Sequence, residues 1–298
     1  PQDDPGAPHL SVTDNSADFH PMGSDFLEIC RQGQLPVCDA PAREGMGITP
    51  YLTTTRDGQR CSSAKAFLRP AMRRRNLTVV TGAHVSRIGF EGTRARSVSY
   101  SRNGQDFKVR AGAEIILAAG AVGSPQILQL SGVGDARYLQ SIGIRSVHNA
   151  PHVGRHLKDH YGINYIFKSK QKTLNDVFGN WPGRMMAGIE YLLRRSGPLS
   201  LSVNQLGGLV KSSASLDRPD TQISMNPLSD QTFHKGRRKL MKPDNFSGFV
   251  LGFNSCRPKS EGTVSITSSR PGKAPSIRPN YLDHEDDRAE ALVMARLS

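Results

Sequence analysis

The stretch Glu114–Gly134, EIILAAGAVGSPQILQLSGVG, is the most informative part of this chain for its fold class. Its apolar run Ile115–Leu117 predicts an inner strand, and the small residues 118–121 follow directly. Ser124 and the proline after it predict a helix over Ser124–Leu130. A strand that ends in small residues before a helix N-terminus leaves the main chain bare, so a nucleotide cofactor can approach it closely. Many α/β proteins make this turn, so the geometry alone predicts α/β structure rather than a ligand.

The composition is that of a soluble globular protein with a basic surface. The 298 residues are 37% hydrophobic, and no apolar run approaches the ~20 residues of a membrane span. The net charge is +13, but the basic residues are scattered and the aromatic residues, at 6%, do not interleave with them. A nucleic-acid surface needs clustered cations and aromatic platforms, so we expect a solvated basic surface and no nucleic-acid partner.

The cysteines indicate the cellular location of the protein, and the two ends of the sequence indicate whether it is a fragment. The four cysteines have no C-x-x-C spacing, which favours reduced thiols in the cytoplasm over a disulfide framework. Peripheral association with a membrane stays open. The chain starts PQDDPGAPHL, without Met or a secretory leader, and stops within the helix-like DDRAEALVMARLS. We therefore expect both ends to be edges of a fragment.

Strands are predicted on either side of residue 90. Leu77–Thr81 and Val85–Phe90 are apolar enough for two of them. Alternating residues then flank Asn103-Gly104, a dipeptide typical of a two-residue hairpin. The expected pairing places two residues of one strand, Val98 and Tyr100, near two of the other, Phe107 and Val109.

A loop at 149–154 marks a predicted domain boundary, and the residues after it favour a different architecture. Short apolar stretches predict a mostly antiparallel sheet with strands at 161–168, 222–225, 249–254, 262–266 and 276–278. The segment Asp176–Leu193 predicts a helix with apolar residues at helical spacing. We expect these residues to face the core, with cofactor-lining methionines as the less favoured alternative; they are Met185, Met186, Ile189, Leu192 and Leu193.

The pattern Gly120-Ala121-x-x-Ser124-Pro125-x-Ile127-Leu128-x-x-Ser131-Gly132-Val133-Gly134 resembles, at every fixed place, the second signature of the glucose–methanol–choline (GMC) flavoprotein oxidoreductases. Further matches follow in the family's order. The segment Thr53–Gly92 is similar to the family's residues before that signature. The phrase VGRHLKDH at 153–160 resembles the family's Val-Gly-Arg-Asn-Leu-x-Asp-His, with His156 in place of Asn. Residues 257–262 and 279–282 match the opening of the family's C-terminal region.

The resemblance implies an FAD-dependent enzyme that removes hydride from an alcohol carbon. Choline-dehydrogenase-like and alcohol-dehydrogenase-like members are most similar. The implied fold is α/β and α+β: a portion of an FAD-binding domain with a parallel sheet, and a substrate domain with a mostly antiparallel sheet. We accordingly expect a substrate-domain or loop segment at 1–50, part of the FAD-binding domain at 51–150, and the substrate-binding domain with the start of the C-terminal GMC region at 151–298.

The resemblance also implies cofactor contacts. Val85 on its own is typical of a core strand, but the matching valine of the family lies against the adenine end of FAD, mainly through its main chain. Ala119, Gly120 and Ala121 correspond to small residues beside the adenosine portion. Ser124 is expected either to touch the cofactor or only to cap the helix.

Two parts of the family's machinery have no counterpart in this sequence. No G-x-G-x-x-G loop, which holds the pyrophosphate of a dinucleotide, is found in a strand–loop–helix context. The catalytic histidine is expected beyond Ser298, so no catalytic residue is assigned and the 298 residues alone are expected to be inactive. The second hypothesis is a non-catalytic binding protein on the same scaffold. The alcohol, the electron acceptor and the oligomeric state stay open.

Four histidines recur every four residues, at 148, 152, 156 and 160. On one helix they would form a metal-binding face, but Pro151 and Gly154 interrupt any helix and no carboxylate or cysteine completes a ligand set. We therefore expect no metal site. Asp159 and His160 are expected to make structural hydrogen bonds.

Overall fold

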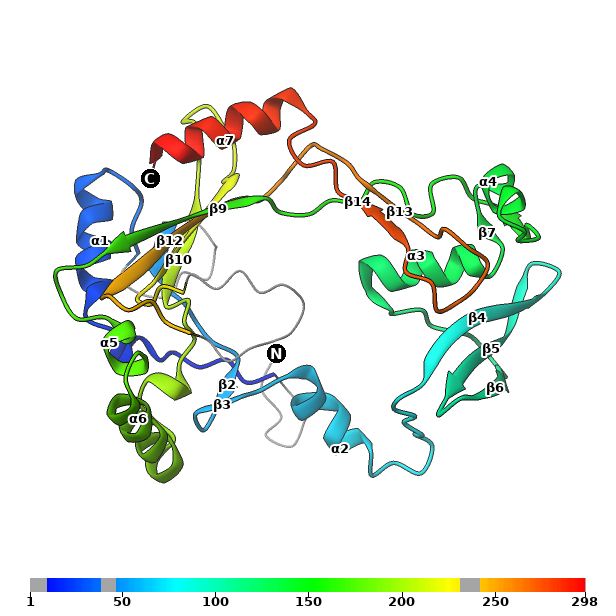
Figure 1. The fold of residues 1–298 in the computed structure, drawn as a ribbon, viewed down its shortest axis with the longest axis horizontal. Coiled ribbons are helices and arrows are strands. Elements are labelled where there is room, and N and C mark those ends of the chain that lie inside the picture. Colours follow the sequence, from blue (N-terminus) through cyan, green and yellow to red (C-terminus); the bar gives the residue numbers. More distant parts are fainter. Residues whose placement is uncertain (1–9, 39–46, 231–241, 298) are drawn as a thin grey trace. The chain divides into compact units, whose positions relative to one another are not determined.

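The computed structural model describes residues 10–38, 47–230 and 242–297. These residues form two compact units (Figure 1). Among the described residues, the first unit comprises 10–38, 47–78, 160–230, 242–257 and 289–297, and the second comprises 79–159 and 258–288. The chain passes between the units more than once, so they do not coincide with the consecutive ranges 1–50, 51–150 and 151–298. The functional assignment of those ranges stays a prediction.

The first unit is built on a five-stranded antiparallel sheet. Its strands, in spatial order, are β1 (Gly47–Pro50), β10 (Leu206–Val210), β11 (Thr221–Asn226), β12 (Gly248–Ser255) and β9 (Gly162–Lys168). Three of its strands lie where they were predicted, at 161–168, 222–225 and 249–254, whereas those at 47–50 and 206–210 were not predicted. The strands predicted at 262–266 and 276–278 exist but pair with each other in the second unit.

Alternate residues of β11 are buried, which is the period of a strand with one face on a core. Helix α1 (Met22–Gln32) packs its Phe26 and Cys30 onto that core, where Ile48 and Met225 are almost fully buried.

The segment 176–193 contains the predicted helix, α6 (Trp181–Arg194), which follows a shorter helix, α5 (Leu174–Phe178). The break falls at Asn180, whose side-chain oxygen accepts from the Gly183 N–H at 2.8 Å and so starts a new helix. The face of α6 predicted to be core is exposed, while Ala187, on another face, is buried. Helical spacing identifies an apolar face but does not say whether that face is covered. The exposed residues are Met185, Met186, Ile189, Leu192 and Leu193.

Smaller elements complete the first unit. They are the hairpin β2 (Thr55–Arg56) and β3 (Gln59–Arg60), a π-helical turn at Ala64–Leu68, α2 (Arg69–Ala71), and 3-10 turns at Ser16–Asp18 and Pro198–Ser200. Helix α7 (Glu285–Leu297) contains the boundary between residues 288 and 289.

The second unit contains a three-stranded antiparallel sheet of β4 (His84–Glu91), β5 (Arg94–Arg102) and β6 (Gln105–Arg110). Asn103 and Gly104 turn between β5 and β6 with φ values of 51° and 78°, as a two-residue hairpin requires. The predicted pairing is confirmed, because Val98 lies opposite Val109 and Tyr100 lies opposite Phe107, with ring centroids 5.2 Å apart.

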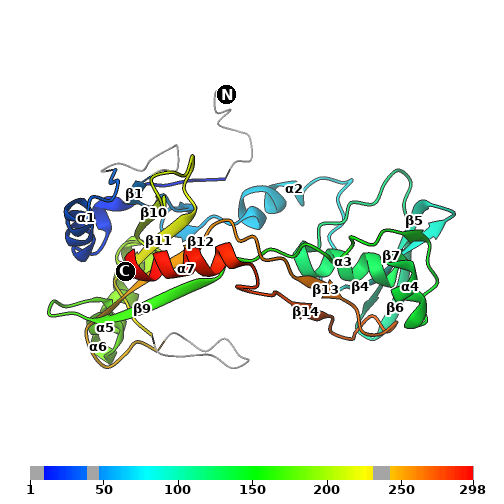
Figure 2. The ribbon, with the colours of Figure 1, turned by 90° about the horizontal axis from the view of Figure 1, so that it is seen from above.

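Helix α3 (Gly120–Leu130) packs against both β4 and β13 (Thr263–Ser265), the first strand of a hairpin with β14 (Ser276–Arg278) (Figures 1 and 2). After α3 come β7 (Val133–Gly134), α4 (Ala136–Ser141) and β8 (His148–Asn149), with β7 and β8 parallel.

Three predictions are wrong: the strands at 115–117 and 77–81, and the start of the helix that follows residue 117. Residues 115–117 are not a strand, and Ile116 is 80% exposed; the predicted strand at 77–81 is likewise irregular. A parallel strand exists only through hydrogen bonds to its neighbours, and no described strand pairs with either segment. The helix also starts at Gly120 rather than Ser124, so Pro125 lies inside it.

Gln129 ties α3 to the rest of the second unit. Its side chain is buried, donates to the carbonyl oxygens of Val264 at 2.9 Å and Val153 at 3.4 Å, and accepts from the Ile266 N–H at 2.9 Å. A Cβ at Gly154 would lie 2.4 Å from the Gln129 amide nitrogen, so glycine permits this approach. The amide therefore joins segments more than 100 positions apart.

We expect Gly132→Ala to destabilise the protein more than Gly143→Ala does. Both glycines have positive φ, at +86° and +78°, so each substitution costs about 1–2 kcal/mol in backbone strain. A Cβ at Gly132 would also lie 2.5 Å from the Arg145 carbonyl oxygen, whereas one at Gly143 meets nothing within 4 Å. The additional loss should be about 1–3 kcal/mol by urea unfolding. Equal losses in the two variants would contradict the close packing.

Candidate functional site

The turn into α3 presents an open main chain. Gly120 has a φ of +79°, and a Cβ there would meet nothing within 4 Å. Ala119, Gly120 and Ala121 are all exposed. The first-turn N–H groups of a helix have no intrahelical acceptor and carry a partial positive charge. The turn therefore has the space and the donors that a polar ligand needs.

Ser124 does not cap α3 as expected. It lies half-buried in the second turn, and its Oγ accepts from the Ala119 N–H at 3.1 Å. The hydroxyl thus satisfies the amide just before the helix and holds the turn at Gly120 in place. Sequence reasoning missed this because it placed the helix start four residues too late.

Val85 is half-buried in β4, where it pairs with Tyr100 beside a bulge. Ser131, at the end of α3, links this strand to the helix. Its Oγ accepts from the Ile88 N–H at 2.8 Å and donates to the Ile127 carbonyl oxygen at 2.5 Å. All five residues predicted to contact a cofactor therefore lie in the second unit, on two elements that pack together.

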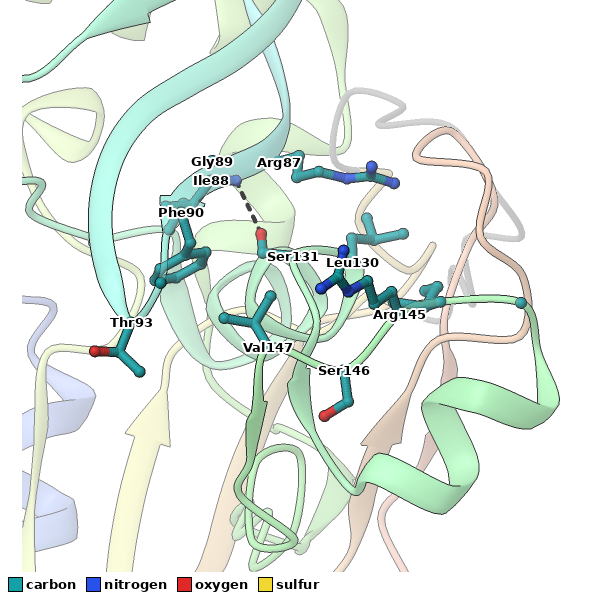
Figure 3. A pocket seen from close by; sticks show the side chains of 13 residues that line it. Arg87, Ile88, Gly89, Phe90, Thr93, Leu130, Ser131, Arg145, Ser146 and Val147 are labelled. Carbon is teal, nitrogen blue, oxygen red and sulfur yellow. Dashed lines mark hydrogen bonds between the residues drawn. The ribbon is translucent and has the colours of Figure 1, made fainter.

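A cavity of about 800 Å³ lies at the other end of α3 (Figure 3). Three separate segments line it, namely residues 87–90 with 92–93, Leu130–Ser131, and 143–147. Arg87 and Arg145 contribute cationic side chains. Sequence reasoning missed this cavity because its walls share no motif, although Ser131 belongs to the signature that begins at Gly120.

The histidines at 148, 152, 156 and 160 do not form one face. His152 Nδ1 lies 3.1 Å from His156 Nε2, and His156 Nδ1 contacts Glu261. The hydrogen bond from His156 lowers the pKa of Glu261. In the described part of the chain, no group of three or more His, Cys, Asp or Glu residues is arranged to hold a metal ion.

Asp159 makes a structural hydrogen bond, as predicted. Its carboxylate accepts from the Tyr281 hydroxyl, and this bond raises the pKa of Tyr281. In the described part of the chain, none of the four cysteines forms a disulfide bond, and burial raises the pKa of Cys30 to about 11. Across residues 10–38, 47–230 and 242–297, no helix is long and apolar enough to cross a membrane.

Comparison with known proteins places these features in a family. The family model described as GMC oxidoreductase matches residues 7–162. The alcohol dehydrogenase [acceptor] of Pseudomonas putida is 34% identical over 284 residues, which cover 93% of this chain and 50% of that protein. The mitochondrial choline dehydrogenase of Homo sapiens is 34% identical over 283 residues, covering 94% of this chain and 46% of that protein. The chain thus spans about half the length of the curated relatives it matches.

Solved structures agree with the predicted fold class. Pyridoxine 4-oxidase from Mesorbium loti superposes with a TM-score of 0.78 at 25% identity, over 98% of this chain and 52% of that chain. A formate oxidase superposes with a TM-score of 0.85 at 21% identity, over 98% of this chain and 54% of that chain, and shows the fold alone. The predicted α/β class is therefore confirmed.

We expect Ser131→Ala to lower the free energy of unfolding by about 1–3 kcal/mol, because it leaves the buried Ile88 N–H without an acceptor. Ser141→Ala is the matched control. The Ser141 hydroxyl is exposed and donates to the Tyr138 carbonyl, so its loss should change stability by less than about 0.5 kcal/mol. Chemical unfolding of both variants provides the measurement. A Ser131 variant as stable as the control would show that this hydrogen bond does not hold α3 to β4.

Proposed function

Because this chain belongs to the GMC oxidoreductase family, we propose that it serves the FAD-dependent oxidation of an alcohol to an aldehyde or ketone. The match over residues 7–162 is the observation that carries the proposal. Similarity to proteins named alcohol dehydrogenase and choline dehydrogenase supports a CH–OH group as the site of oxidation. When bound, FAD accepts the hydride.

The residues at the start of α3 fit an adenosine group. The test is steric: the space in front of Gly120 is free of protein atoms to 4 Å, and its flanking alanines are small and exposed. Ala119, Gly120 and Ala121 would hold the adenosine portion of FAD through main-chain contacts, with Val85 at the adenine end. Ser124 would act by fixing the Ala119 amide, whether or not it also touches the cofactor.

The substrate side of the proposal rests on the first unit, whose antiparallel sheet is the architecture expected of a substrate domain. Hydride leaves an alcohol carbon readily only as the hydroxyl loses its proton, so a base must accompany the flavin. No residue of this chain is assigned that role. We therefore assign two roles to this chain: binding the adenosine portion of FAD and binding a small alcohol.

We expect Gly120→Leu to lower the flavin content of the full-length protein, because the leucine would fill the space left for the cofactor. Gly104→Leu is the matched control, since Gly104 has a φ of +78° and equally open surroundings but lies in the hairpin. Both variants carry about 1–2 kcal/mol of backbone strain. The flavin-to-protein absorbance ratio and the thermal unfolding temperature should be measured together. A folded Gly120 variant with full flavin occupancy would overturn the assignment.

The reaction itself is tested by mixing the flavin-loaded full-length protein with primary and secondary alcohols in the absence of oxygen. Oxidation of a substrate should bleach the visible flavin absorbance and yield one carbonyl product per flavin reduced. The matching aldehyde or ketone serves as the control and should leave the flavin oxidised. A protein that binds FAD tightly but is reduced by no alcohol would favour the non-catalytic alternative.

A further inference from the structure

The cavity at the C-terminal end of α3 is built by the helix itself. Ser131 fixes one wall, because its Oγ accepts from the Ile88 N–H of β4 (Figure 3). Gly132 fixes the opposite wall, because its carbonyl oxygen accepts from the Val147 N–H at 2.7 Å. At the same glycine, a Cβ would lie 2.5 Å from the Arg145 carbonyl oxygen, so the segment that bears Arg145 sits directly on the helix end.

The charge in this cavity is positive and uncompensated. Arg87 projects from β4 and Arg145 from the 143–147 segment, and both line the cavity (Figure 3). Among the described residues, neither guanidinium has a carboxylate within ion-pair distance. The nearest acidic residue along β4, Glu91, is already paired with Arg96 at 3.1 Å and Arg110 at 3.3 Å.

Two residues with hydroxyl groups lie in the same walls. Thr93 follows the β4 lining segment, and Ser146 follows Arg145. A guanidinium presents a planar fork of N–H groups that matches the oxygens of a phosphate. The Thr93 hydroxyl points away from both guanidinium groups (Figure 3), so the two arginines are the donors on which the site depends. Among the described residues that line the cavity, there is no carboxylate that would repel an anion. Glu91 lies between two lining residues, but its carboxylate is paired with Arg96 and Arg110.

We propose that this cavity binds the phosphate group of a small soluble molecule, with Arg87 and Arg145 as the charged contacts. The site is separate from the turn assigned to FAD. That turn is at Gly120, and the cavity begins at Leu130, so the length of α3 stands between them. Eleven residues of α-helix extend about 15 Å. The proposal therefore does not depend on whether the chain binds flavin.

Isothermal titration of the full chain tests the proposal with inorganic phosphate, pyrophosphate and ribose 5-phosphate. Ribose 5-phosphate carries no base that could enter an adenosine site, and it separates phosphate esters from the inorganic ions. We expect saturable binding that weakens with salt, because each guanidinium–phosphate contact is electrostatic. Arg87→Ala and Arg145→Ala should each weaken it by about tenfold or more, the loss expected for one charge-assisted hydrogen-bonding partner.

Arg102→Ala is the matched control, since Arg102 is an exposed arginine of β5 that does not line the cavity. It removes the same charge and should change the affinity by less than about twofold. Arg87→Lys keeps the positive charge but removes the planar fork of guanidinium N–H groups. The affinity for phosphate should therefore fall.

Three results would overturn the proposal. The first is the absence of saturable binding of any of the three phosphates to the folded chain. The second is binding that Arg87→Ala and Arg145→Ala weaken no more than Arg102→Ala does. The third is binding to vesicles of phosphatidic acid without binding to the soluble phosphates, which would assign the two arginines to a membrane surface.

Discussion

The second unit depends on a buried amide whose hydrogen bonds are all made within the protein. Gln129 uses two donors and one acceptor on Val153, Val264 and Ile266, and it is only 4% exposed. A buried amide without partners costs several kcal/mol, so these segments can shift only together. Gln129 lies near the C-terminal end of α3 and holds that end of the helix against the segments that contain Val153, Val264 and Ile266. The cavity begins directly after this anchored residue, at Leu130.

The signature from Gly120 to Gly134 therefore has two physical parts. Its first part is small and exposed, and it leaves main-chain donors open to a ligand. Its second part is buried and makes contacts within the protein: Ser131 joins α3 to β4, and Gly132 admits the Arg145 segment. The signature thus combines a first part that leaves open space at the start of α3 with a second part that packs against the rest of the second unit.

The sequence predicted best what short-range physics determines. For the hairpin at Asn103-Gly104, the predicted residue pairs are the observed ones, because a two-residue turn fixes the register of its strands. Three of the five strands of the first unit were also predicted, and two of them, β9 and β11, show an alternating burial pattern. The other two, β1 and β10, were missed; their burial patterns do not alternate. Features that depend on partners far away in the sequence were not predicted correctly. Residues 115–117 look like a strand but have no described neighbour to pair with, and the apolar face of α6 is exposed. The cavity escaped prediction for the same reason, since its three walls meet only in the fold.

Glycine at positive φ does not by itself indicate a binding site, as a comparison within this chain shows. Gly132 is closed in by the Arg145 carbonyl, so its lack of a side chain is explained by packing. Gly104 and Gly120 share nearly the same φ and the same open surroundings. In the hairpin, the turn geometry accounts fully for Gly104. Gly120 differs because it opens a helix, where unpaired N–H groups and the helix dipole favour a polar ligand. Gly120 therefore combines open space with a helix N-terminus, and neither feature alone would indicate a binding site.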